Sequence, residues 1–313
     1  MRTTLCVLFV AACGSNPTPA LNDMASPPDL WRPPTFAEQL VISAVTLPVN
    51  RAQYAVDVDG DGKPEDQFGG VVGFLKTAGF NLQTNIDSTI AVGDGLNLLS
   101  LASIDKTFMM DNGAQLTMYT ALAQNPPDFT GSGTFAIDKT VPKGVLNGDL
   151  ENSYFLSLDP LSIPSPATVY IHLVLAHLQN MTPVAINMPL VGARIQLTNQ
   201  GMGMWQGQLN GGLHQTDIDT ILIPGLTMAL DETEQEPGCP MECQQVKAQF
   251  DTNMDGHVTL EEVRNNILVQ TLLKPDVQLF DMNGKWHPTV GAPNADSISI
   301  GVGFNAVGAS FPE

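Results

Sequence analysis

Residues 296–305 read Asp-Ser-Ile-Ser-Ile-Gly-Val-Gly-Phe-Asn and are the clearest indication of the fold class. The large apolar residues in this stretch alternate strictly with Ser, Gly and Asn. Successive side chains of a β-strand point to opposite faces, so the alternation predicts a strand with one buried face. Further strand candidates lie upstream, separated by clusters of Gly, Pro, Asn and Asp. They are 96–104, 114–123, 133–138, 145–151, 168–178, 191–198 and 203–209.

The strongest chemical signal is residues 251–262, which read Asp-Thr-Asn-Met-Asp-Gly-His-Val-Thr-Leu-Glu-Glu. Side-chain oxygens at positions 1, 3, 5, 9 and 12, with Gly at position 6, match the calcium loop of an EF-hand. Calcium needs six to eight oxygens at about 2.3–2.6 Å, and alternate residues of a turn converge on one point. The expected ligands are Asp251, Asn253, Asp255, the His257 carbonyl, Thr259 and Glu262. The alternative is an acidic turn that only resembles such a loop.

Helical spacing of apolar residues on both sides of this loop, in 242–250 and 261–274, predicts a helix–loop–helix unit. Short helices are also expected at 68–75 and 82–90, and a helix at 216–222 is expected to end before Pro224. The sequence therefore predicts a mainly β (α+β) protein. Its antiparallel, sandwich-like body would have short helices near the N-terminus and an EF-hand inserted before the last strand.

A second acidic loop lies at residues 57–66, Asp-Val-Asp-Gly-Asp-Gly-Lys-Pro-Glu-Asp. It begins like an EF-hand loop, but Pro64 stands where an apolar residue is usual, and it resembles the shorter calcium loops of dockerins and of integrin-type and thrombospondin-type repeats. That resemblance implies five ligands and leaves Asp66 as a substitute ligand or helix cap. The five ligands are Asp57, Asp59, Asp61, the Lys63 carbonyl and Glu65. The alternative is a Gly-rich acidic hairpin turn.

The N-terminus has the layout of a secretory signal, with one Arg followed by a short apolar run,. Val10-Ala11-Ala12-Cys13 resembles the lipobox of bacterial lipoproteins, which implies cleavage before Cys13 and a lipid on its sulfur. Gly14 follows, where Asp would suggest retention in the inner membrane, so we expect the outer membrane. Residues 13–35 are Pro-rich and predict a tether. An ordinary signal in which Cys13 is incidental is the alternative.

Two further cysteines, Cys239 and Cys243, remain for the exported part of the chain. In an oxidising compartment a disulfide between them is the simplest expectation. A redox or metal-binding role would favour the Cys-x-x-Cys spacing or additional ligands, and the sequence has Cys-x-x-x-Cys alone.

Acidic residues outnumber basic ones 32 to 13, and the formal net charge is −19. Binding a polyphosphate needs clustered Lys and Arg, so this balance argues against a nucleic-acid partner and favours cations. The sequence also contains no His-Glu-x-x-His, no Gly-x-Ser-x-Gly and no dinucleotide fingerprint,. It favours a non-enzymatic protein without excluding an enzyme.

The expected organisation follows from these segments. It consists of a signal peptide (1–12), a tether (13–35), a calcium loop with helices (36–94), a β-rich body (95–236), a disulfide with the EF-hand (237–275) and a closing strand (276–313). The lipobox, both calcium loops and the ending 296–304 together resemble uncharacterised EF-hand-bearing lipoproteins of the myxobacterial type. That resemblance implies an envelope location and calcium, and no activity.

We therefore expect a calcium-binding, lipid-anchored cell-envelope protein in which calcium stabilises the fold. Its role would be structural, adhesive or ligand-binding, with a glycan, peptide or lipid as the ligand and the membrane reached through the lipid anchor. The alternative is an exported hydrolase with structural calcium, whose acids, such as Asp217 and Asp219, would lie in a cleft,.

Overall fold

The structure is a computed structural model that describes residues 33–77, 82–176, 184–234, 248–288 and 294–312. Contacts divide the chain into two units, Met1–Arg32 and Pro33–Glu313, and every described residue belongs to the second. The predicted signal peptide, Cys13, Cys239 and Cys243 lie outside the described residues. Within the described part of the chain, no helix has both the length and the apolar character needed to cross a bilayer.

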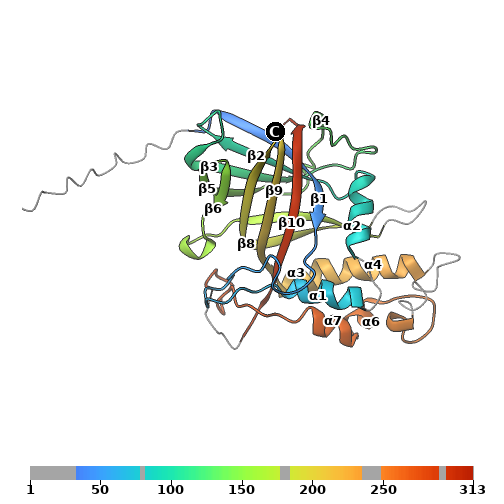
Figure 1. Ribbon diagram of the computed structural model, residues 1–313. Coiled ribbons are helices and arrows are strands. Elements are labelled where there is room, and N and C mark those ends of the chain that lie inside the picture. Colours follow the sequence, from blue (N-terminus) through green and yellow to red (C-terminus); the bar gives the residue numbers. More distant parts are fainter. Residues whose placement is uncertain (1–32, 78–81, 177–183, 235–247, 289–293, 313) are drawn as a thin grey trace, which may run out of the picture. The chain divides into compact units, whose positions relative to one another are not determined.

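Eight strands pair side by side in a closed ring (Figure 1). In ring order they are β1 (Phe36–Thr46), β2 (Asn97–Ser103), β3 (Met110–Thr120), β5 (Gly144–Glu151), β6 (Tyr154–Ser157), β8 (Val184–Gly201), β9 (Met204–His214) and β10 (Ser297–Ser310). Each pairs antiparallel with the next, and β10 pairs antiparallel with β1. Outside the ring order, β7 (Thr168–Ala176) pairs with β8, and the short β4 (Gly133–Thr134) runs parallel to β10.

The predicted sandwich is therefore wrong, and the body is a closed antiparallel barrel. A sandwich has two sheets with separate edges, whereas β1 is hydrogen-bonded to β2 on one side and to β10 on the other. Inward and outward side chains alternate along the strands of both architectures, so the sequence pattern does not distinguish them. The pairing of the first strand with the last one decides between them.

Two apolar clusters hold the barrel together. The main cluster includes Leu40, Leu99, Leu116, Phe155, Ile195, Trp205 and Phe304. A second cluster includes Val41, Leu98, Tyr119, Phe135 and Phe311. Because Leu40 and Val41, like Leu98 and Leu99, are neighbours in a strand, the two clusters lie on opposite faces of the sheet. The strands β1 and β2 are consequently packed on both faces.

The strand β10 is also covered on the face that was expected to be solvated. Ser299 is 0% exposed, and Gly301 and Gly303 are buried as well. A Cβ atom on either glycine would collide with Tyr54, which belongs to the loop after β1. The small residues of β10 therefore permit this loop to lie directly against the sheet.

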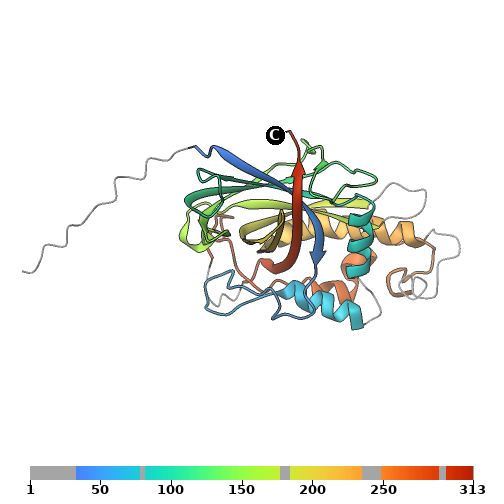
Figure 2. The same cartoon turned by 45° about the horizontal axis from the view of Figure 1, so that its top comes forward.

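The helices are α1 (Gln67–Thr77), α2 (Leu82–Ala91), α3 (Gln215–Asp217), α4 (Ile223–Glu234), α6 (Leu260–Asn265) and α7 (Ile267–Leu272). Figures 1 and 2 show α1, α4, α6 and α7 gathered at one end of the barrel, with α2 beside β1. The contacts agree, because α1 packs on β10 and α7, and α4 packs on β7 and β8. The helices expected at 68–75 and 82–90 are confirmed.

The helix expected to stop before Pro224 instead continues to Glu234. The chain passes from α3 through a π-helical segment, Ile218–Leu222, directly into α4. Pro224 is the second residue of α4 and follows this wider π-helical turn, so it does not interrupt a regular helix interior. A Cβ atom on Gly225 would come within 2.6 Å of the Ile186 side chain. Gly225 thus permits α4 to pack closely on β8.

The predicted helix–loop–helix EF-hand before the last strand is also not what the structure shows. A single helical turn, 248–250, is the described part of the entering helix. The exiting helix, expected over 261–274, is split into α6 and α7 at Asn266, whose backbone is extended. The Asn266 side chain accepts a hydrogen bond from the Leu268 N–H at 2.9 Å and so starts a new helix,.

Candidate metal centre

The loop between β1 and α1 carries the first group of predicted ligands. The Glu65 N–H donates to the Val56 carbonyl at 2.9 Å, and this isolated antiparallel bridge closes the base of the loop. Gly60 and Gly62 lie within it at φ +85° and +82°. Residues with a Cβ atom rarely adopt this left-handed backbone conformation, so the two glycines permit the tight winding of the loop.

This winding brings four carboxylates together. Asp57, Asp59, Asp61 and Glu65 each offer one oxygen, and these oxygens all lie within 4.8 Å of one another. In the described ranges, no other group of three or more His, Cys, Asp or Glu side chains converges in this way. The four are carboxylate ligands predicted for the first loop, and the structure confirms that they form a cluster that could hold a metal ion.

Backbone N–H groups within the loop orient the carboxylates. Asp57 accepts hydrogen bonds from the N–H groups of Gly60 at 2.6 Å and Gly62 at 2.8 Å. Asp59 accepts from the Asp61 N–H at 3.1 Å, and Asp61 accepts from the Lys63 N–H at 2.7 Å. An Asp side chain bound to the backbone two residues further on forms a turn of its own. The repeated Asp-x-Asp-x-Asp spacing therefore wraps the chain around one point.

The electrostatics of the cluster favour a cation. Burial raises the pKa of Asp59, which is 7% exposed, and the neighbouring carboxylates add to the rise. Burial raises the pKa of Glu65 to about 7, again with a contribution from the Asp charges. Lys63 lowers the pKa of Asp61 because its Nζ lies 2.7 Å from Asp61 Oδ2. Lys63 brings one positive charge to four carboxylates and is itself exposed, so it offsets only part of the negative charge of the cluster.

The donor set fits a hard divalent cation. All four side-chain ligands are carboxylate oxygens, which suit calcium or magnesium, whereas zinc sites are built mainly from Cys and His. Calcium accepts six to eight oxygens in flexible geometry, and magnesium demands a near-ideal octahedron. A short loop with four carboxylates, whose backbone already winds around them, fits calcium better.

Asp66 connects this loop to the barrel. Its Oδ1 accepts hydrogen bonds from the N–H groups of Gly69 at 2.9 Å and Gly301 at 3.3 Å, so it caps α1 and also holds β10. Its Oδ2 is buried and has no hydrogen-bond partner. Burial raises the pKa of Asp66 to about 7, with Asp276 adding to the rise. Of the two roles considered for Asp66, the structure supports the helix cap.

Tyr54, which no sequence motif singles out, fixes the other side of the loop. Its backbone has φ +63°, a left-handed conformation that is uncommon outside glycine,. Its carbonyl accepts a hydrogen bond from Gln208 Nε2 at 2.9 Å and another from Asn210 Nδ2. The acidic loop is thus tied to β9 through Tyr54 and to β10 through Asp66.

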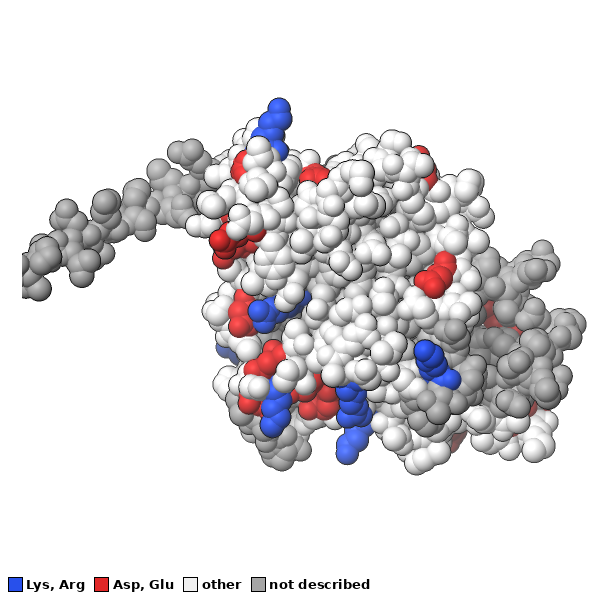
Figure 3. All heavy atoms as spheres, in the orientation of Figure 1, with Lys and Arg blue, Asp and Glu red and all other residues white. Residues whose placement is uncertain are grey.

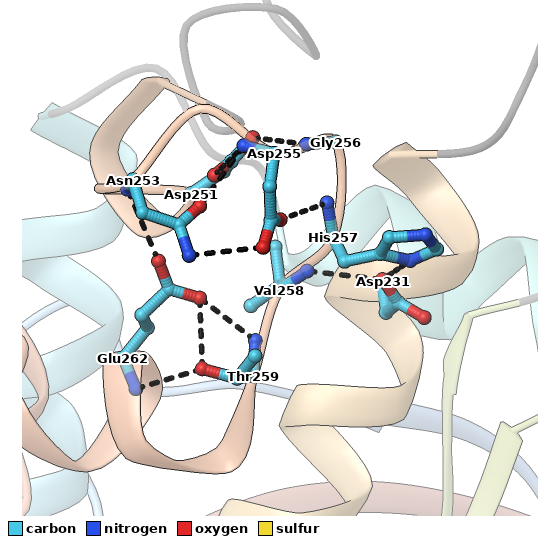
Figure 4. Close-up of polar contacts among 9 residues, drawn as sticks. All are labelled: Asp231, Asp251, Asn253, Asp255, Gly256, His257, Val258, Thr259 and Glu262. Atoms are coloured by element: carbon cyan, nitrogen blue, oxygen red, sulfur yellow. Dashed lines mark hydrogen bonds and ion pairs between the residues drawn. The ribbon is translucent and has the colours of Figure 1, made fainter.

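The second predicted loop, 251–262, is wound by its own hydrogen bonds (Figure 4). Asp251 accepts from the N–H groups of Asp255 at 3.1 Å and Gly256 at 3.0 Å. Figure 4 shows the Glu262 side chain reaching from α6 back to the loop, where it accepts from the N–H groups of Asn253 and Thr259. The Thr259 N–H bond is the main reason why the pKa of Glu262 is lowered to about 2.

Two of these residues and one residue of α4 serve the structure of the loop and of α6. Thr259 and Glu262 cap α6 reciprocally, since each side chain accepts from the other residue's N–H,. Asp231 of α4 accepts from the Val258 N–H at 2.9 Å and contacts His257 Nδ1 at 3.2 Å. Whether Asp251, Asn253, Asp255, His257, Thr259 and Glu262 bind a cation stays a prediction. Asp231 could not be found from the sequence, because it lies 27 residues before Val258.

The acids named for the alternative hydrolase do not lie in a cleft that the structure defines. Asp219 accepts from Gln215 Nε2 at 3.0 Å, and burial raises the pKa of Asp217. Four hollows formed by described residues are lined by apolar and neutral polar groups with one His, and neither acid lines any of them.

No protein-family model, curated protein sequence or solved structure matches this chain. The resemblance to EF-hand-bearing lipoproteins therefore stays a prediction.

Proposed function

We propose that this protein binds calcium at Asp57, Asp59, Asp61 and Glu65, and that the ion holds the loop after β1 against the outer face of the barrel. The convergence of the four carboxylate oxygens within 4.8 Å carries the proposal. Like charges at this separation repel, and a divalent cation removes the repulsion. Binding energy is then coupled to the folding of the loop, because the ligands come together only in the folded chain.

The calcium has a stabilising role in this proposal. The loop contributes Val58 to a small apolar cluster with Val277 and Leu279, and it covers the glycines of β10. A ligand that binds only the folded state at 100 times its Kd adds about 2.7 kcal/mol to the free energy of unfolding. In a domain of this size, each kcal/mol shifts Tm by about 2–4 °C. Saturating calcium should therefore raise Tm by roughly 5–10 °C.

The test compares thermal unfolding of Asp57→Asn and of the unmodified protein, each with excess calcium, with magnesium and with chelator. Asp149→Asn, at an exposed position on β5 outside the loop, is the matched control that removes the same charge. The Asp57 variant should lose most of the rise in Tm with calcium, and the control should keep it. Equal rises in both variants would place the stabilising ion elsewhere and contradict the proposal.

The wider role we propose is that of a lipid-anchored, non-catalytic protein of the cell envelope, most simply of the outer membrane. The support is the lipobox-like Val10-Ala11-Ala12-Cys13, the Pro-rich segment after it and the acidic composition. No observation in the described structure favours the hydrolase, since Asp217 and Asp219 line none of the four hollows.

A further inference from the structure

A polar hollow of about 210 Å³ lies on the outer face of the barrel beside the acidic loop. Its floor comes from β1, β8, β9 and β10, and Tyr54 and Tyr154 contribute to its lining. Its polar lining includes Thr46, Gln196, Thr198, Gln206, Gln208 and Asn305. No Asp, Glu, Lys or Arg lines it, although the chain as a whole is strongly acidic. Figure 3 shows the same uncharged character at the front of the molecule over β9 and β10.

The register of the strands builds this surface. Gln196 of β8 pairs with Gln208 of β9, and Thr198 pairs with Gln206. Gln206 in turn pairs with Asn305 of β10. Directly opposed residues of antiparallel strands share a face, so these side chains lie together in one band across three strands.

Several of these groups are free to bind a ligand. Gln208 Nε2 is already used, because it donates to the Tyr54 carbonyl and to Asn210 Oδ1 at 2.8 Å. Within the described residues, the amides of Gln196 and Gln206 have no hydrogen-bond partner, although Gln196 is half-buried. Each amide offers two N–H donors and one acceptor oxygen, so the hollow has unused donors and acceptors.

The aromatic wall is held in place by the fold. The Tyr54 side chain lies on Gly303 of β10, where a Cβ atom would come within 2.5 Å of the hydroxyl and 2.6 Å of the ring. Two amides of β9 hold its carbonyl, and its left-handed backbone fixes the direction in which the chain enters the acidic loop. Tyr54 is therefore positioned before any ligand arrives.

The uncharged lining of amides and tyrosine rings suits some classes of ligand better than others. An ionic ligand would find no opposite charge in the lining, and a lipid would bury the free amides without hydrogen bonds, which is costly. An extended peptide usually pairs with an open strand edge, and β8, β9 and β10 are paired on both sides here,. Hydroxyl groups of a sugar donate and accept at once and so match amide groups, while tyrosine rings cover its apolar face.

We propose that this hollow binds a neutral sugar unit, with Gln196, Gln206 and Asn305 hydrogen-bonding to its hydroxyls and Tyr54 and Tyr154 packing against its ring. A volume of about 210 Å³ is below the roughly 300–1,000 Å³ of sites for drug-sized ligands and fits one sugar ring,. The inference rests on the proposed function in one respect only: calcium holds the loop that presents Tyr54.

The experiment titrates the full-length protein, in excess calcium, with glucose, galactose, mannose and N-acetylglucosamine, and follows binding by calorimetry. At least one of these sugars should bind saturably. Gln206→Ala, at an exposed position, and Tyr54→Gly, which suits the left-handed backbone, should each weaken that binding at least tenfold. Gln115→Ala, which removes an outward-facing amide from β3, is the matched control and should leave it unchanged. Unfolding curves of each variant show that it is folded.

Absence of binding to all four sugars, or equal binding by Gln206→Ala and the unmodified protein, would overturn the inference. Stronger binding of the anionic sugar glucuronate or of decanoate would overturn it as well. Chelation separates it from the proposed function. If sugar binding survives chelator and Asp57→Asn, the hollow is a sugar site and the proposal that calcium holds the loop is wrong. If calcium binds and no sugar does, the sugar inference alone fails.

Discussion

Replacing Asp66 by Asn should make the metal-free protein more stable at alkaline pH and leave its stability at acidic pH nearly unchanged. Asp66 is 2% exposed, and one of its two oxygens has no hydrogen-bond partner. An Asn side chain keeps an acceptor for the N–H groups of Gly69 and Gly301 and removes the charge that burial disfavours,. The replacement therefore tests whether this carboxylate is held at a cost to stability.

The direction of the effect follows from proton linkage. Burial raises the pKa of Asp66 from an ordinary 3.8 to about 7 in the folded chain. The contribution of protonated Asp66 to the free energy of unfolding is fully present below pH 3.8 and is lost as the pH rises through 7. Each pKa unit corresponds to about 1.4 kcal/mol. After an allowance for screening by solvent, Asn should therefore raise the free energy of unfolding by about 2–4 kcal/mol at pH 8 relative to pH 4.

Urea unfolding at pH 4 and pH 8 in chelator measures this difference. Asp149→Asn, at an exposed site on β5, removes the same charge and serves as the matched control, which should lack the large gain in stability at pH 8. If Asp66→Asn is less stable than the unmodified protein at pH 8, or changes the free energy of unfolding equally at both pH values, the Asp66 carboxylate does not destabilise the folded chain. Either result would mean that the carboxylate is paired with a group that compensates its burial.

Three further predictions concern the segments on which the envelope role and the second loop depend. Cys13→Ser should move the protein out of the membrane fraction, and unchanged fractionation would refute lipidation. Mass spectrometry of unreduced peptides should find Cys239 linked to Cys243, and two free thiols after export would count against the bridge. Glu262→Gln should lower Tm even in chelator, because its carboxylate accepts the N–H groups of Thr252 at 2.9 Å and Thr259 at 2.9 Å. A decrease in Tm that appears only in the presence of calcium would instead indicate that Glu262 acts chiefly as a calcium ligand.

Local patterns in the sequence identified many of the elements but not their closure into a barrel. Alternation located β10 and much of β8 and β9, and helical spacing located α1 and α2. The strand β1 gave no alternating signal, because Leu40-Val41-Ile42 is buried on both faces. Closure depends on the pairing of β1 with β10, across almost the whole chain, and no local pattern encodes that partner.

The acidic cluster was predictable because all of its residues are close together in the sequence. Its ligands lie within nine residues, and the Asp-x-Asp-x-Asp spacing with two glycines already defines how the chain must wind. What surrounds it was not predictable, because Tyr54 meets Asn210 and Asp66 meets Gly301 through contacts 156 and 235 residues apart. The polar hollow likewise arises from the register of three strands, which the sequence does not show.

A crystal structure of the protein grown with calcium would show whether one calcium ion joins the four carboxylates. We expect one strong peak of electron density with an oxygen of each of Asp57, Asp59, Asp61 and Glu65 at about 2.3–2.6 Å. Tyr54 and Asp66 should keep their present contacts. Electron density without an ion among these carboxylates, at a calcium concentration that stabilises the protein, would contradict the proposal.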